Sequence, residues 1–344
     1  MSEQGALYRK YRPQTFVEVR DQDHIVTVLQ GAIKKGDIPH ALLFSGTRGT
    51  GKTTLARIFA KEIGTKNIDL YEIDAASNRG IDDVRELKEA VHTVPYESKY
   101  KVYIIDEVHM LTKEAFNALL KTLEEPPAHV VFILATTEEE KLLDTILSRC
   151  LVFRFNSPSR QVLIDAVTDV AKKEGFTLSP EAAGLIAIAA DGSFRDALGV
   201  TQKVIMASGD KIGSADEVAS IIGAPKRVVI LDLLQAFSVK DTALGLRAIE
   251  TATTSHTDVK LLLRLLLESI RAVMLIRNRP DEKDEILASY DPDTKERLLS
   301  LAKESSSLNS HLLLRLIKTV EESNRSPLPY LPLEIALIEQ VGNQ

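Results

Sequence analysis

Residues 41–54 have the sequence ALLFSGTRGTGKTT, in which an apolar run leads into a glycine-rich segment that ends in lysine and threonine. The run 41–44 predicts a buried strand, and residues 55–60 (LARIFA) predict the helix that follows it. Residues 46–53 fit the pattern G-x-x-x-x-G-K-[ST], whose glycines let backbone N–H groups fold round phosphates at a helix N-terminus. Strand, loop and helix in this order predict a nucleotide-binding loop rather than a chance glycine turn.

The same pattern predicts the contacts that a nucleoside triphosphate would make. We expect Lys52 to meet the β- and γ-phosphates and the Thr53 hydroxyl to ligate Mg²⁺, so the expected cofactors are ATP and Mg²⁺. The other loop residues expected to contact the nucleotide are Gly46, Thr47, Gly49, Thr50, Gly51 and Thr54.

Four further apolar runs alternate with helical patterns in the first 156 residues. Residues 70–73 (LYEI), 102–105 (VYII) and 130–134 (VVFIL) each predict a buried strand. Residues 151–155 (LVFRF) are more amphipathic and predict a strand nearer an edge. Continuous apolar runs separated by helices are typical of a parallel sheet covered on both faces, which predicts an α/β domain.

Two acids, Asp106 and Glu107, directly follow the run 102–105. Buried strands rarely end in paired carboxylates without a positive partner, because unpaired buried charge is costly. Asp106 fits a place in the Mg²⁺ shell, and Glu107 fits a general base that activates the attacking water. The alternative is a pair of solvated acids at a strand end.

Thr137 and Arg149 lie where a P-loop enzyme could use them. Thr137 follows the run 130–134, at the sheet edge where ligands bind in open α/β sheets. Arg149 precedes the run 151–155 and could act on the γ-phosphate of a neighbouring subunit. Spacing leaves the alternatives open: a strand-end cap for Thr137 and a surface salt bridge for Arg149.

After residue 158 the strand patterns stop. Residues 160–223 predict three or four short helices, and a second helical block follows Pro225. Its Leu-rich stretch 261–276 is apolar on more than one helical face, which fits either a helix central to its own bundle or one packed on neighbouring subunits. The predicted domains are residues 1–156, 157–223 and 224–344.

Composition limits the other possibilities. The chain of 344 residues has a net charge of −6, with 44% apolar and 27% charged residues, so any nucleic-acid contact must come from a local basic surface. The polar start and the charges within residues 259–276 predict neither a leader nor a membrane contact, and hence a cytoplasmic protein. Cys150 is the only cysteine, which excludes an internal disulfide and a multi-cysteine zinc site.

Six segments resemble one family, the gamma/tau subunits of bacterial DNA polymerase III, which are AAA+ ATPases of its clamp loader. The resemblance implies a five-stranded α/β ATPase domain, a helical lid and a helical collar for oligomerisation. The segments are 8–16 (YRKYRPQTF), 44–53 (FSGTRGTGKT), 72–78 (EIDAASN), 105–111 (IDEVHML), 117–127 (NALLKTLEEPP) and 148–150 (SRC).

The resemblance also implies roles for single residues. Arg149 would be an arginine finger acting in trans, Thr137 the sensor at the end of the fourth strand, and Arg195 a lid arginine that reports the γ-phosphate. The alternative for Arg195 is an ion pair at a helix cap. The N-terminal segment would line the adenine pocket, since aromatic and proline side chains make a flat apolar wall; an ordered arm is the alternative. Its residues are Tyr8, Tyr11, Arg12 and Pro13.

The implied partners are other clamp-loader subunits in a pentamer, the sliding clamp and primer–template DNA, which would be held by its phosphates. The candidate DNA contacts, for which an ordinary solvated surface is the alternative, are Asn78, Arg79, Arg85 and Lys121, with Thr122 beside it. The family's usual four-cysteine zinc module is replaced by the short link 64–67, so we expect no zinc. The chain resembles the short gamma form rather than tau.

Two other hypotheses remain. A Holliday-junction branch-migration motor would share this core but would need a winged-helix domain, whose strand pair is missing from the pattern after Pro225. A structural clamp-loader subunit without hydrolysis would not need Lys52, Thr53, Asp106 and Glu107 together. The clamp-loader ATPase therefore explains most of the sequence.

Overall fold

The computed structural model describes residues 5–77, 87, 89–208, 212–288 and 290–342. The chain forms two compact units. The first unit contains residues 1–163 and 192–196, and the second contains residues 164–191 and 197–344.

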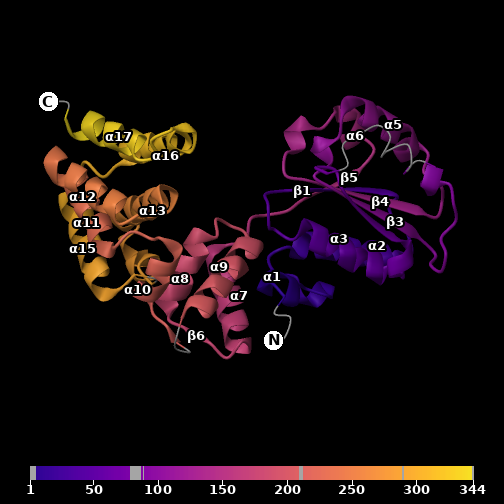
Figure 1. The fold of residues 1–344 in the computed structure, drawn as a ribbon, viewed down its shortest axis with the longest axis horizontal. Helices are drawn as coiled ribbons and strands as arrows, with labels where there is room; N and C mark the ends of the chain where they lie inside the picture. The colour runs from indigo at the N-terminus through magenta and orange to yellow at the C-terminus, as the bar shows by residue number, and fades with distance from the viewer. Residues whose placement is uncertain (1–4, 78–86, 88, 209–211, 289, 343–344) are drawn as a thin grey trace. The chain divides into compact units, whose positions relative to one another are not determined.

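The first unit is built on a five-stranded sheet of order β2-β3-β4-β1-β5, in which every pair is parallel (Figure 1). This confirms the α/β class and the five strands expected from the sequence. The strands are β1 Ala41–Ser45, β2 Leu70–Asp74, β3 Lys101–Asp106, β4 Val130–Thr136 and β5 Leu151–Arg154.

Helices cover both faces of this sheet (Figure 1). On one face Leu43, Tyr103 and Phe132 pack with α5 (Lys113–Glu124). On the other face Phe44 and Ile104 pack with α2 (Asp23–Lys35) and α3 (Lys52–Glu62). Successive strand residues point to opposite faces, so strands buried on both sides are largely apolar, as β1 is before Ser45 and β4 is before Thr136.

The prediction that residues 70–73 form a buried strand is wrong in one respect. The strand β2 exists, but its residues are half-buried or exposed, because it is an edge strand with a neighbour on one side only. The expectation that the fifth strand lies near an edge is confirmed, since β5 pairs only with β1. The remaining short elements of this unit are α1 Leu7–Lys10, η1 Phe16–Glu18, η2 Asn67–Asp69, η3 Val108–Met110, η4 Glu139–Lys141 and α6 Asp144–Leu147.

Four short helices follow β5, as expected: α7 Arg160–Lys173, α8 Pro180–Ala189, α9 Phe194–Ala207 and α10 Ala215–Ile222. Ser179 caps α8 by accepting from the Ala182 N–H. The expectation of no strand beyond residue 158 is wrong. Thr177–Leu178 (β6) and Ile212–Gly213 (β7) pair as a small parallel sheet, and two residues per strand are too few to produce a visible alternation.

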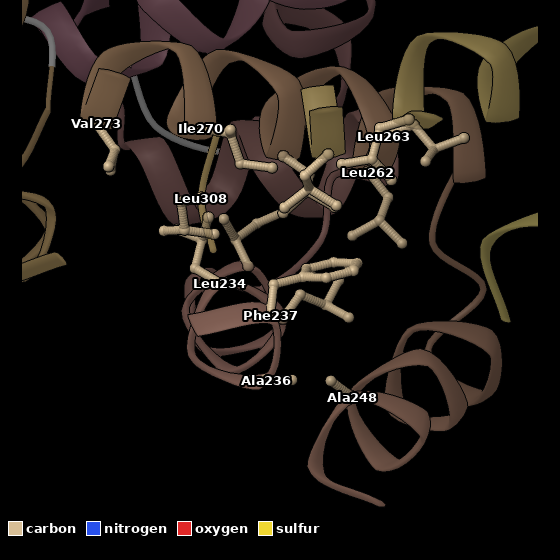
Figure 2. Packing of buried hydrophobic residues seen from close by; sticks show 14 of the residues in the cluster. Leu234, Ala236, Phe237, Ala248, Leu262, Leu263, Ile270, Val273 and Leu308 are labelled. Atoms are coloured by element: carbon tan, nitrogen blue, oxygen red, sulfur yellow. The ribbon is translucent and has the colours of Figure 1, made fainter. Parts of the chain in front are cut away.

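The rest of the second unit is helical over the described residues from 225 to 342. Its centre is α13, where Leu262, Leu266 and Ile270 are fully buried. Figure 2 shows side chains of α13 pointing toward Leu234 and Phe237 of α11. The elements are α11 Arg227–Val239, α12 Thr242–Thr254, α13 Val259–Asn278, η5 Pro280–Glu282, α14 Lys283–Ile286, α15 Pro292–Glu304, α16 Ser310–Arg325 and α17 Leu331–Val341.

The multi-faced apolar pattern of residues 261–276 is therefore explained by a helix central to its own bundle, so it is no evidence for a subunit interface. Arg264 of α13 donates to the Ile188 carbonyl of α8 at 2.9 Å, which joins the two helical blocks inside one unit. The division into three domains stays a prediction. Of the helices that the structure describes, none combines the length and apolar composition needed to cross a membrane.

Candidate nucleotide site

The glycine-rich loop joins β1 to α3 and has the backbone that its glycines permit. Gly49 and Gly51 have φ of +77° and +106°, which side-chain-bearing residues rarely adopt. A Cβ on Gly49 would lie 1.9 Å from the Ser193 hydroxyl oxygen, and the Phe194 N–H donates to the Gly49 carbonyl at 3.0 Å. This close approach fixes segment 192–196 on the loop and so brings Arg195 to the site.

Lys52 is the buried cation of the loop. Its Nζ donates to the carbonyls of Gly46 and Thr47 at 2.6 and 2.8 Å. Burial lowers the pKa of Lys52, while the carboxylates of Glu107 and Asp106 oppose that shift. A lysine that is held by loop carbonyls and faces two acids is placed to bind phosphate, which is the role predicted for it.

The acids at the end of β3 meet the first turn of α3. The Thr53 hydroxyl donates to Asp106 Oδ2 at 2.8 Å, and the Glu107 N–H donates to Asp106 Oδ1 at 3.0 Å. Glu107 itself has a φ of +48°, a left-handed conformation that costs a non-glycine residue about 1–3 kcal/mol. Such strain persists only where neighbours hold the residue, and it is commonly found at functional sites.

One neighbour that holds Glu107 is Thr137. This residue follows β4, and its hydroxyl donates to Glu107 Oε2 at 3.0 Å. The contact is compatible with the predicted sensor role, because a change in the position of Glu107 would be felt directly at the end of β4. Sequence reasoning assigned no role to His109, whose side chain lies between these two strand ends.

A pocket of about 710 Å³ opens beside Thr53 and Asp106. Of the four N-terminal residues predicted to contact nucleotide, Tyr8 and Arg12 line it, whereas Tyr11 and Pro13 are not among its lining residues. Arg195 also lines it and lies with its guanidinium carbon 5.6 Å from the Tyr8 ring centroid, within cation–π range. The structure thus brings together the N-terminal arm, the lid arginine and the proposed metal ligands.

Positive charge collects in this pocket. Burial lowers the pKa of Arg12, and the neighbouring guanidinium groups of Arg57 and Arg195 lower it further. Arg57, which the sequence reasoning missed, pairs with Glu72 at 2.5 Å. It lies one helical turn after Thr53, so its position facing the site could have been anticipated from α3 alone. Four arginines and three carboxylates line the pocket, and this excess of positive charge favours an anionic ligand.

Two oxygen ligands are available for a divalent cation, the Thr53 hydroxyl and the Asp106 carboxylate. Mg²⁺ usually keeps several waters and phosphate oxygens and takes only one or two protein ligands, so this pair fits it. Among the described residues, no three His, Cys, Asp or Glu side chains gather as a protein metal cage.

Arg149 lies apart from these groups, between α6 and β5. Its guanidinium donates to the Thr145 carbonyl at 2.5 Å and forms an ion pair with Glu124 at the end of α5. The surface salt bridge considered for Arg149 is therefore present in this chain. Cys150 beside it is largely buried, which raises the pKa of its thiol to about 11 and keeps it protonated.

Three of the four candidate DNA contacts, Asn78, Arg79 and Arg85, lie outside the described residues. Lys121 is exposed on α5, as a phosphate contact requires. The suggestion that Thr122 faces DNA is wrong, because this residue is 5% exposed and lies on the buried face of α5. Neighbouring helical positions point about 100° apart, so the two side chains cannot share one face.

The glycine-rich loop after β1, the acidic end of β3 and the β2-β3-β4-β1-β5 order define a P-loop protein of the AAA+ class. Solved structures of the same fold include the Holliday junction branch migration motor RuvB of Thermotoga maritima. It matches with a TM-score of 0.53 and 20% identity over 69% of this chain and 85% of that one. At this identity the likeness shows the fold alone.

Family models give a finer assignment. The model described as DNA polymerase III, delta subunit, matches residues 65–159. The model for the clamp loader subunit ATPase lid domain matches residues 164–210, and the model for domain III of subunits gamma and tau matches residues 214–342.

Curated relatives agree. The gamma subunit of Buchnera aphidicola DNA polymerase III is 36% identical over 298 residues, which are 80% of each chain. The tau subunits of Escherichia coli and Bacillus subtilis are 36% and 39% identical over 95% and 80% of this chain. The chain spans about half of their length, 53% and 52%. This chain belongs to the DNA polymerase III gamma/tau subunit family.

Proposed function

We propose that this chain hydrolyses ATP as a subunit of a DNA sliding-clamp loader. The observation that carries the proposal is the position of Glu107: its carboxylate is held by Thr137 directly beside the Thr53–Asp106 pair. A base, a metal-binding pair and a phosphate-binding lysine thus meet at the carboxyl ends of β1, β3 and β4. Hydrolysis needs these three parts at one place.

Each residue has a separate task in this mechanism. Lys52 and the N–H groups at the start of α3 bind the phosphates, and Arg195 meets them from segment 192–196. Thr53 and Asp106 hold Mg²⁺, which when bound supplies charge neutralisation at the phosphate oxygens. Glu107 orients the attacking water and accepts its proton, and Thr137 keeps the carboxylate aimed.

The remaining positive charge comes from a second subunit. Within its own chain Arg149 contacts Thr145, Ser148 and Glu124, none of which is a proposed nucleotide-binding residue. In an assembly, Arg149 exchanges Glu124 for the γ-phosphate bound by the adjacent subunit, and the site is complete only there.

The proposed partners follow from the family. They are further loader subunits in a pentamer, a ring-shaped clamp, and primer–template DNA contacted through phosphates by Lys121. Contact of this kind is independent of sequence and weakens as salt rises. A cytoplasmic location is inferred because the relatives are subunits of DNA polymerase III.

An ATPase assay on the reconstituted loader, with and without clamp and primed DNA, tests the proposal. Turnover should rise when clamp and DNA are both present. Lys52→Ala should abolish nucleotide binding and turnover, whereas Lys66→Ala, at a surface ion pair with Glu97, should change neither. Turnover that persists in Lys52→Ala at the wild-type rate would contradict the assignment of the site.

The likeness of fold agrees with the branch-migration hypothesis, but the winged-helix domain that this hypothesis requires for DNA binding is not found among the described residues. The described residues after 225 form helices and turns, without the strand pair that a winged-helix domain needs. Junction-stimulated ATPase activity with no response to clamp would favour that motor. Nucleotide binding without turnover in any assembly would favour the structural subunit.

A further inference from the structure

We infer that His109 is a positioning residue for ATP hydrolysis: its imidazole joins the ends of β3 and β4 and holds Thr137 against Glu107. The inference rests on the proposed function and adds a residue that the reaction does not touch. The His109 side chain is buried and lies close to residues at the ends of both strands.

His109 lies in η3, two residues beyond Glu107, and its side chain is 6% exposed. Its Nδ1 lies 2.9 Å from the Thr136 hydroxyl, and its Nε2 lies 3.0 Å from Glu138 Oε2. Both ring nitrogens therefore reach the segment that leaves β4. The ring itself belongs to the segment that leaves β3.

The hydrogen bonds select one tautomer. The hydrogen bond from Lys141 lowers the pKa of Glu138, so its carboxylate is charged and accepts the Nε2 proton of His109. Nδ1 then accepts from the Thr136 hydroxyl, whose oxygen in turn accepts the Glu138 N–H at 3.0 Å. In this arrangement each nitrogen of the His109 ring has a partner in the β4 segment, Thr136 or Glu138.

Thr137 lies between the two residues that His109 binds. With Thr136 and Glu138 both fixed, the Thr137 hydroxyl is aimed at Glu107 Oε2, 3.0 Å away. His109 Nδ1 lies 3.5 Å from the same oxygen, too far for a hydrogen bond of good geometry but close enough to limit rotation of the carboxylate. The same carboxylate oxygen of Glu107 therefore has both Thr137 and the imidazole of His109 as close neighbours.

A second histidine shows what a purely structural role looks like in this sheet. His129 precedes β4 at the opposite end of that strand, and its Nε2 contacts only the backbone carbonyls of Val91 and Thr93, at 3.3 and 3.1 Å. It contacts no group of the nucleotide site. His129→Ala is thus a matched control for loss of an imidazole.

The test compares three variants of His109 in the reconstituted loader with clamp and primed DNA. In His109→Ala, we expect kcat to fall about 10- to 100-fold, since displacing a catalytic group by about 1 Å costs about 100-fold. The Kd for a fluorescent ATP analogue should stay within about twofold of wild type, because Lys52 and Arg195 are untouched. His109→Asn, which keeps a polar group near Thr136, should retain more of kcat.

His109→Gln, whose amide can reach Glu138, tests the contribution of the contact with Glu138. If the alanine variant does not fold, either amide variant can be assayed in its place. Thr137→Val in the His109→Ala background should add little further loss, because the two residues act on one carboxylate. His129→Ala should lower Tm without changing kcat.

The inference is overturned if folded His109→Ala keeps kcat within twofold of wild type, or if His129→Ala lowers kcat equally. It is also overturned if the His109 and Thr137 losses multiply. A failure of the proposed function looks different, because then Glu107→Gln would leave turnover unchanged as well.

Discussion

The two halves of the proposed catalytic site differ in how this chain holds them. Glu107, Asp106 and Thr137 are joined with Thr53 by hydrogen bonds at the ends of β3 and β4 and the start of α3. Arg149 lies on the surface, one third exposed, and pairs with Glu124, which is itself nearly half exposed. One half is built by the fold of a single chain, and the other half lies away from it.

The difference shows which part of the chemistry can be regulated. The residues of the first half are only half-buried, but three hydrogen bonds link them, so breaking this network would leave several polar groups without partners. An exposed ion pair contributes only about 0.2–1 kcal/mol, so Arg149 can exchange its carboxylate for a phosphate at little cost. We therefore propose that assembly and DNA control the reaction through Arg149, while the base and the metal-binding pair stay in place.

Arg149→Ala should have the largest effect on turnover and should separate the two halves of the site most clearly. Turnover stimulated by clamp and DNA should fall by about 10³–10⁵, the range found for other arginine fingers. The ATP affinity of the isolated subunit should not change, because the contacts of Arg149 in its own chain are with Thr145, Ser148 and Glu124. Arg154→Ala, which breaks a similar surface pair with Glu139, is the control and should keep stimulated turnover.

Glu107→Gln tests the half of the site that is held together within a single chain. Loss of the general base should lower kcat by about 10²–10⁴, both with and without DNA. ATP binding should be retained, as measured by fluorescence of an analogue. Glu97→Gln, far from the site at the Lys66 pair, should behave as wild type; an unchanged kcat in Glu107→Gln would remove Glu107 from the mechanism.

The smallest effect is expected from Glu124→Gln, which removes the stored partner of Arg149. Turnover of the loader without DNA should rise by up to about fivefold, the equivalent of about 1 kcal/mol for an exposed pair. The stimulated rate should stay within about twofold. Glu125→Gln changes the adjacent exposed carboxylate and should leave both rates alone; a fall in the DNA-independent rate of Glu124→Gln would mean that Glu124 assists the finger instead.

Much of the first unit could be predicted from the sequence because its signals are local. The apolar runs of β1 and β4, and the glycine pattern of the loop after Phe44, each predict their structure from adjacent residues alone. Two strand assignments failed where position in the sheet matters. The exposure of β2 depends on its edge place, and β6 with β7 is held by pairing between residues 35 apart in the chain.

The same limit applies to the site. The motif residues Lys52, Asp106 and Glu107 came from spacing, but their supporting residues come from other elements. Glu124 is 25 positions from Arg149, and His109 meets Thr136 only because β3 and β4 are neighbours. The Leu-rich pattern of α13 was ambiguous for a related reason: apolar faces do not say whether their partners belong to the same chain.

A mixing experiment tests the central claim, that a neighbour's Arg149 completes each nucleotide pocket. Lys52→Ala and Arg149→Ala subunits are each expected to give loaders without stimulated turnover. Assembled together, the Lys52→Ala subunit should supply its arginine to the intact pocket of the Arg149→Ala subunit, and DNA-stimulated ATP hydrolysis should return. A mixture as inactive as its two components, or an Arg149→Ala loader that hydrolyses ATP at the wild-type stimulated rate, would contradict the account.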